Sequence, residues 1–268
     1  MFIRLEVVPM AENYFIDQTR LNGRVAVVTG AGRGLGKEIA LALASAGSDI
    51  ALMARTESQL EETAREIEAC GRKALVIPID VAKSEEVDHA IERVTQNLGP
   101  VDILVNNAGI TEQKPLVKIT DEDWHRVMGI NLDGPFFLCR AVGRRMIERK
   151  KGKIINIGSV LGLVGYKRFA SYSTSKGALL QFTRSLALEW AKYGINVNAI
   201  ALGWFLTEMN AEAMSDEKIR KAHVSRIPLG RLGDTQEIGP LVIYLASPAS
   251  DFMTGSVIVL DGGELVNW

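Results

Sequence analysis

Three side chains, at positions 159, 172 and 176, are able together to polarise and protonate a carbonyl oxygen. Tyr172 and Lys176 are four residues apart in a stretch that predicts a helix, so both lie on one face. A free phenol titrates near ~10, and a neighbouring ammonium lowers that pKa because it favours the phenolate. We therefore expect Lys176 to tune Tyr172 as a general acid and base, with the Ser159 hydroxyl beside it.

A glycine-rich loop follows the first predicted strand. Residues 24–29 are an apolar, β-branched run typical of a buried parallel strand, and residues 37–44 predict an Ala-rich helix. The loop between them carries Gly30, Gly34 and Gly36. A strand, a glycine loop and a helix in this order form a cradle for a dinucleotide, whose pyrophosphate binds at the helix N-terminus.

The end of the next strand indicates which dinucleotide binds. A site for NAD places an acid there to bind the ribose 2′-hydroxyl. This chain has Ala54 and then Arg55, and the loop adds Arg33. Because no carboxylate repels a 2′-phosphate and two cations can bind one, we predict that NADP is preferred over NAD. The alternative is that Arg55 only begins a solvated helix.

Further motifs occur in order along almost the whole chain. They are Thr29-Gly30-x-x-x-Gly34-x-Gly36, Asp80-Val81, Asn106-Asn107-Ala108-Gly109, Asn131, Ser159, Tyr172-x-x-x-Lys176 and Asp261-Gly262-Gly263. With these motifs the chain resembles the short-chain dehydrogenase/reductase family. The resemblance implies an oxidoreductase that transfers a hydride between nicotinamide and a ketone or secondary alcohol. The alternative of another class is a non-catalytic relative that binds the dinucleotide as a sensor.

The resemblance assigns catalytic roles to four residues. Tyr172 would donate and accept the proton, and Ser159 would bind the substrate oxygen. Lys176 would lower the pKa of Tyr172 and bind the nicotinamide ribose. Asn131 would anchor a water that relays protons to Lys176.

The resemblance also implies where the cofactor and substrate bind. Asp80 would bind the adenine amine with Val81 beside the ring, and Leu202 replaces the family's proline before Gly203. The predicted cofactor-binding residues are Gly30, Arg33, Gly34, Leu35, Gly36, Arg55, Asp80, Val81, Asn107, Ala108, Gly109, Tyr172, Lys176, Gly203, Phe205 and Thr207. The predicted substrate-binding residues are Ser159, Leu161, Tyr166, Trp204 and Met209.

Alternating strand and helix patterns predict the fold class. We expect an α/β fold, a Rossmann-type doubly wound parallel sheet in a single domain of residues 21–268 after an N-terminal extension of residues 1–20. One long helix is expected over residues 121–150, with a cap at Thr120 and Asp123. The sequence of residues 204–228 predicts two short helices, and by the resemblance this segment would be a mobile substrate lid.

The substrate is less sharply indicated. Residues 203–209 resemble relatives that reduce sugar acids, of the gluconate 5-dehydrogenase type. Residues 157–165 resemble 3-oxoacyl-acyl-carrier-protein reductases, whose two basic docking residues would be Lys150 and Tyr193 here. Only one of these two is basic, so the sugar acid or a small keto compound is favoured and the acyl substrate is the alternative.

Composition excludes several other classes. The chain has 268 residues, a net charge of −1 and no basic stripe that would indicate nucleic acid. Its 2 cysteines and 3 histidines show no disulfide or metal-ligand spacing, so no metal is expected. No membrane span is expected, and the first twenty residues lack a signal-peptide core, which favours the cytoplasm. By the resemblance, the two long helices would build a homotetramer.

Overall fold

One parallel sheet of seven strands organises the protein. The computed structural model describes residues 14–208 and 211–268. The strands lie in the order β3-β2-β1-β4-β5-β6-β7, and each strand is parallel to its neighbours. Their bounds are β1 Val25–Thr29, β2 Asp49–Ala54, β3 Ala74–Pro78, β4 Ile103–Asn106, β5 Gly152–Ser159, β6 Ile195–Leu202 and β7 Val257–Leu260. The prediction of a doubly wound α/β sheet is confirmed.

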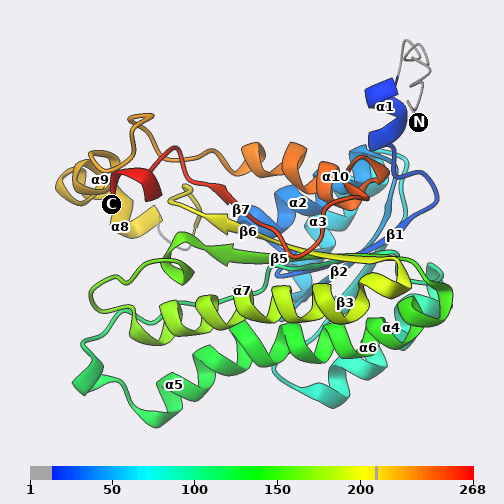
Figure 1. The fold of residues 1–268 in the computed structure, drawn as a ribbon, viewed down its shortest axis with the longest axis horizontal. Helices are drawn as coiled ribbons and strands as arrows, with labels where there is room; N and C mark the ends of the chain where they lie inside the picture. Colours follow the sequence, from blue (N-terminus) through cyan, green and yellow to red (C-terminus); the bar gives the residue numbers. More distant parts are fainter. Residues whose placement is uncertain (1–13, 209–210) are drawn as a thin grey trace, which may run out of the picture.

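Helices cover both faces of the sheet (Figure 1). One face packs on α2 (Gly34–Ser45), α3 (Glu57–Ala69) and α10 (Gly239–Ala246). The other packs on α4 (Ser84–Asn97), α6 (Gly134–Arg149) and α7 (Ala170–Trp190). Alternate residues of β1 belong to the two cores, as the period of two in a strand requires. Burial on both faces explains why the strands are continuous apolar runs.

The order of strands reverses between β1 and β4. The chain runs from β1 toward β2 on one side of this point and from β4 toward β5 on the other. The loops that follow β1 and β4 therefore diverge, and a fold of this kind binds its ligand in the crevice between them, at the carboxyl ends of the strands. The glycine loop follows β1 and Asn107 follows β4, so both occupy this position. Ser159 ends β5 and pairs in register with Leu202 at the end of β6. The sheet thus delivers the predicted motifs to one edge.

The expected helix over residues 121–150 is interrupted. The structure has α5 (Asp121–Met128), a π-helical segment η2 (Gly129–Asp133) and then α6. The prediction of one regular helix is wrong there, because Asn131 in the middle of η2 bonds groups outside the helix. The start was predicted correctly: Thr120 and Asp123 form a reciprocal capping box.

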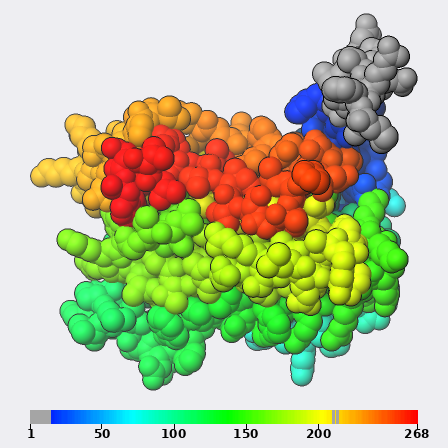
Figure 2. All heavy atoms as spheres, viewed as in Figure 1, coloured from blue at the N-terminus to red at the C-terminus, as the bar shows by residue number. Residues whose placement is uncertain are grey.

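The structure also contains helices in the expected lid and in the expected N-terminal extension. Within the expected lid, α8 (Ala211–Ser215) and α9 (Glu217–Val224) lie at the same end of the sheet as the C-terminal residues (Figures 1 and 2). In the expected N-terminal extension, α1 (Tyr14–Thr19) lies against the short helix η6 (Pro248–Ser250). No helix among residues 14–208 and 211–268 is long and apolar enough to cross a membrane.

Candidate active site

The Ser159 and Tyr172 hydroxyls meet beyond the end of β5. Ser159 is 7% exposed, and its Oγ accepts a hydrogen bond from the Leu161 N–H at 3.1 Å, which fixes the side chain. Tyr172 lies in the first turn of α7 and is half-buried. Burial raises the pKa of Tyr172, and a hydrogen bond with Ser159 opposes that rise only in part. The pair presents two hydroxyls to the same small volume, as a carbonyl-binding site requires.

Lys176 follows one turn later and is 4% exposed. Its Nζ donates a hydrogen bond to the Ile157 carbonyl oxygen at 2.7 Å and lies 5.8 Å from the centroid of the Tyr172 ring. Burial lowers the pKa of Lys176 to about 8. Removal from water thus raises the pKa of the Tyr172 phenol and lowers that of the Lys176 ammonium. A lowering of the Tyr172 pKa by Lys176 stays a prediction.

Asn131 joins the η2 segment to the loop after β4. Its Oδ1 accepts from the Ile110 N–H at 2.9 Å, and its Nδ2 donates to the Ile110 carbonyl at 2.9 Å and to the Ser175 hydroxyl at 3.0 Å. A methyl group added to Gly109 would lie 3.4 Å from both Asn131 Oδ1 and Lys176 Nζ. The structure thus brings Asn131, Gly109 and Lys176 together. A water held by Asn131 stays a prediction.

The glycine loop leaves no room for side chains at two positions. Gly30 has a φ of +66°, a conformation that favours glycine. A methyl group on Gly36 would collide with the Gly30 carbonyl oxygen and lie 2.5 Å from Asn107 Nδ2. Such a close turn lets a pyrophosphate approach the backbone and the N-terminus of α2, so the cradle fits a dinucleotide.

Thr29 holds this cradle together; the sequence placed it in the glycine motif but indicated no role for it. Its Oγ1 accepts two hydrogen bonds of 3.0 Å, from the N–H groups of Asn107 and Ala108. In return Asn107 Nδ2 donates to the Thr29 carbonyl at 2.9 Å. The signal was available, since a threonine ends the strand before the glycine loop, but its partners lie far along the chain.

The predicted adenosine end is more open. Arg55 is exposed and has no ion pair within the part of the chain that the structure describes. Arg33 lies 3.7 Å from Glu208, with both side chains exposed, so the pair is weak. Asp80 Oδ1 accepts from the Ala82 N–H at 3.1 Å. Val81 is buried against Gly134 of α6.

Three predicted cofactor residues follow β6. The Gly203 N–H donates to the Leu260 carbonyl at 3.0 Å, which ties this loop to β7. Phe205 is buried, pairs with Gly233 as an isolated parallel bridge, and belongs to the core under α2 and α10. The Thr207 side chain lies near Gly34, because a methyl group on Gly34 would be 3.8 Å from Thr207 Cβ. Leu35 packs on the same core as Phe205.

The predicted substrate residues form a small apolar cluster around Tyr172. Leu161, Tyr166 and Trp204 all belong to it, together with Phe169. The centroid of the Phe169 ring lies 5.5 Å from that of Tyr166 and 6.3 Å from that of Tyr172. Met209 lies outside the described residues. The structure therefore brings Leu161, Tyr166 and Trp204 together with Tyr172 in one cluster.

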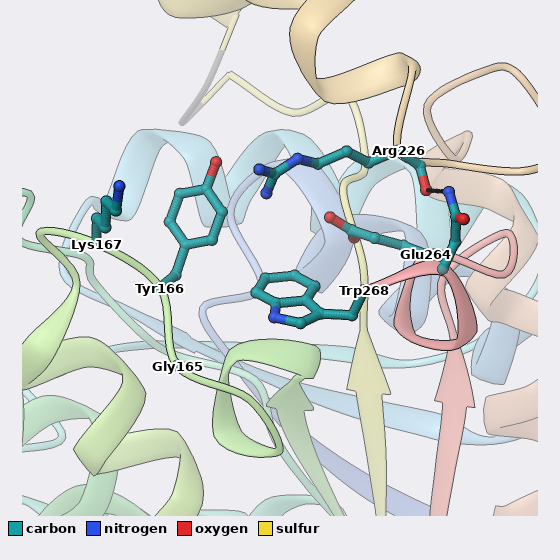
Figure 3. A pocket seen from close by; sticks show the side chains of 7 residues that line it. Gly165, Tyr166, Lys167, Arg226, Glu264 and Trp268 are labelled. Carbon is teal, nitrogen blue, oxygen red and sulfur yellow. Dashed lines mark hydrogen bonds between the residues drawn. The ribbon is translucent and has the colours of Figure 1, made fainter.

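A pocket of about 400 Å³ opens beside this cluster (Figure 3). It is lined by residues 165–167, by Arg226, and by the C-terminal residues Glu264, Asn267 and Trp268. Sequence reasoning missed these residues from the lid and the C-terminal segment. Only the Asp261-Gly262-Gly263 motif hinted at them: Asp261 accepts hydrogen bonds from the Gly263 and Leu265 N–H groups and so turns the chain toward the pocket.

No group of three or more potential metal ligands occurs among residues 14–208 and 211–268. The site itself combines the hydroxyl pair, the buried lysine and the glycine cradle. They suit proton transfer to a carbonyl oxygen beside a bound dinucleotide.

Comparisons with known proteins agree with this geometry. The profile of the short chain dehydrogenase family matches residues 24–218. The chain is 37% identical to gluconate 5-dehydrogenase of Gluconobacter oxydans (strain 621H) over 94% of this chain and 98% of that protein. It is 39% identical to a 3-oxoacyl-[acyl-carrier-protein] reductase of Vibrio cholerae over 91% of this chain and 98% of that protein.

A solved structure gives the same result. The crystal structure of a gluconate 5-dehydrogenase from Burkholderia cenocepacia J2315, in complex with NADP and tartrate, superposes with a TM-score of 0.90 at 40% identity. The match covers 94% of this chain and 99% of that chain. The protein therefore belongs to the short-chain dehydrogenase family, a class of oxidoreductases that act on CH–OH groups. The family resemblance predicted from the motifs is confirmed.

Proposed function

We propose that the protein is an NADP(H)-dependent oxidoreductase that interconverts a ketone and a secondary alcohol on a sugar acid. The observation that carries the proposal is the meeting of the Ser159 and Tyr172 hydroxyls beside Lys176 and the glycine cradle. The named activity of the Gluconobacter relative and the NADP in the Burkholderia structure support the sugar acid and the cofactor.

The proposed mechanism assigns each proton to a residue of this chain. When bound, the nicotinamide supplies or accepts the hydride. Ser159 orients the carbonyl oxygen with a hydrogen bond, because its hydroxyl is fixed beside that of Tyr172. Tyr172 gives its proton to the oxygen during reduction and takes it back during oxidation. Lys176, with a pKa of about 8, exchanges protons near neutral pH and restores the protonation state of Tyr172.

A Tyr172→Phe variant tests this assignment. The substitution removes the proton donor and keeps the ring that packs on Phe169. We expect NADPH consumption with 5-ketogluconate to fall at least a hundredfold, as for loss of a general acid, while NADPH still binds. Retained turnover would refute the role of Tyr172. Intact NADPH binding by a wild-type protein that reduces no ketone would instead favour a dinucleotide sensor.

The preference for NADP rests on the adenosine end of the site. Ala54 supplies no carboxylate, and Arg55 is exposed without an ion pair in the described chain, so its guanidinium remains available to a 2′-phosphate. We expect Arg55→Asp to weaken NADPH at least tenfold and to leave NADH almost unchanged, measured by quenching of protein fluorescence. The proposal is wrong if wild-type protein binds NADH as tightly as NADPH.

One observation keeps an acyl-carrier substrate as a second candidate. A methyl group on Gly194 would lie 2.8 Å from the Lys150 carbonyl oxygen, so Lys150 and the turn containing Tyr193 are neighbours. Lys192 Nζ lies 5.0 Å from the Tyr193 ring and adds a cation where Tyr193 has none. Parallel assays with 5-ketogluconate and an acetoacetyl thioester separate the two substrates, because only the preferred one supports rapid NADPH consumption.

A homotetramer is proposed as the assembled form. Phe136 of α6 and Leu188 of α7 are exposed large apolar side chains on the two long helices, and apolar faces of this kind are buried in symmetric assemblies. Light scattering measures the mass directly, and a monomer would remove this part of the proposal.

A further inference from the structure

The pocket beside the catalytic cluster is lined by a cation, Arg226, which acts on the Glu264 carboxylate of the same pocket only at longer range. The Arg226 guanidinium carbon lies 5.5 Å from the centroid of the Tyr166 ring and 5.8 Å from that of Trp268. Figure 3 shows the guanidinium pointing toward Tyr166, above the indole of Trp268. Among residues 14–208 and 211–268, Arg226 forms no ion pair. Contacts with ring faces position a guanidinium without consuming its N–H donors, so these donors remain available to an anion.

The same pocket also offers an acceptor. Glu264 is almost fully buried, and its Oε1 accepts from the Trp204 indole N–H at 3.0 Å. Glu264 Oε2 has no hydrogen-bond partner within the described chain. A buried acceptor without a partner is costly unless a ligand or water satisfies it. A hydroxyl group suits this oxygen, whereas a second carboxylate would be repelled.

The pocket adjoins the catalytic hydroxyls. Tyr166, which packs on Arg226, is linked to Tyr172 through the single intervening ring of Phe169. Trp204, which binds Glu264, belongs to the same apolar cluster as Tyr172. The pocket and the catalytic tyrosine therefore share one continuous wall of aromatic side chains.

We propose that this pocket is the subsite for the carboxylate end of an open-chain polyhydroxy acid, with Arg226 as the residue that selects acids over uncharged polyols. Lys167, on the same wall, adds positive charge, and Glu264 receives a substrate hydroxyl. The inference rests on the proposed function and deepens it, because it names the side chain that recognises the acid.

D-Gluconate and D-glucitol test the subsite, since they differ only in a carboxylate against a hydroxymethyl group at C1. With NADP⁺, we expect Arg226→Gln to lower kcat/KM for D-gluconate roughly ten- to hundredfold, mostly through KM, as for loss of a charge-assisted hydrogen bond. D-Glucitol should change less than twofold. Arg226→Lys should restore part of the loss on D-gluconate, because it keeps the charge.

Arg220→Gln is the matched control. Arg220 is an exposed arginine of α9 that does not line the pocket, so its loss should leave both substrates unchanged. Equal losses of D-gluconate and D-glucitol in Arg226→Gln would overturn the inference, and so would an unchanged KM for D-gluconate. Thermal unfolding of each variant shows whether a loss reflects the fold.

Calorimetric titration of D-gluconate into the NADP⁺-loaded protein separates the two proposals. Turnover of D-gluconate that is insensitive to Arg226→Gln refutes the subsite and leaves the proposed function intact. Binding of D-gluconate that needs Arg226, without turnover, supports the subsite and refutes the proposed function. Neither binding nor turnover of D-gluconate refutes both.

Discussion

Replacing Thr29 by valine should loosen the cofactor cradle without changing its shape. Valine has almost the same volume as threonine, but it lacks the hydroxyl that accepts from the Asn107 and Ala108 N–H groups. Thr29 is 1% exposed, so these two donors lose their partner in a confined space. Each orphaned donor costs about 1–3 kcal/mol, and part of that cost is relieved because Asn107 and Ala108 are only partly buried. We expect a loss of about 2–4 kcal/mol.

Thr29→Ser is the matched control, because it keeps the hydroxyl and removes one methyl group. That deletion should cost about 1 kcal/mol. Urea unfolding of both variants measures the free energy of unfolding, and NADPH fluorescence measures the Kd. We expect Thr29→Val alone to weaken NADPH binding several-fold, since the segment after β4 loses two of its hydrogen bonds to β1 and keeps only those of the Asn107 amide. Equal stability and equal Kd in the two variants would refute the reasoning that the hydroxyl positions the cradle.

Three further predictions concern buried groups. Burial lowers the pKa of Lys176 from 10.5 to about 8, so the folded protein loses this proton at a lower pH than the unfolded chain, and the free energy of unfolding rises with pH between those two values. From pH 7 to 9.5 the free energy of unfolding of the wild type, measured in urea, should rise by about 2 kcal/mol relative to that of Lys176→Met. Parallel pH profiles of the two proteins would contradict this. Gly36→Ala should abolish NADPH binding, because the added methyl group collides with the Gly30 carbonyl oxygen. An unchanged Kd for NADPH in a fluorescence titration would show that the backbone of the loop shifts to accommodate the methyl group. Asn156→Leu should lower the free energy of unfolding in urea by about 2–4 kcal/mol, because the Asn156 amide donates a hydrogen bond to the Thr183 hydroxyl inside the core. A loss below about 1 kcal/mol would mean that water replaces the amide as the partner of Thr183.

Features set by local sequence were predicted correctly. The Thr120–Asp123 capping box depends on residues three positions apart, and the glycine loop on one strand, one turn and one helix. Both patterns have short-range physical causes, so they could be identified without the fold.

Features that depend on residues far apart in the sequence could not be predicted from local patterns. Asn131 breaks the regular helix because it bonds Ile110 and Ser175, and no periodicity in residues 121–150 encodes those bonds. The burial that raises the pKa of Tyr172 depends on the packing of several segments, which the spacing between Tyr172 and Lys176 does not encode. The position of Arg226 between Tyr166 and Trp268 joins three segments that only the folded chain brings together.

The π-helical segment η2 sets the angular position of α5 relative to α6. Bonding from i to i+5 uses one residue more per turn than the α-helix, so α5 is out of phase with α6 by one residue. Deleting one residue from 129–133 would restore a continuous helix, but it would rotate α5 by about 100° around the axis. That rotation would carry Asp123 away from Lys114, whose Nζ it binds at 2.7 Å. The Lys114–Asp123 contact thus ties the loop after β4 to the angular phase of α5, and a deletion in residues 129–133 would break it.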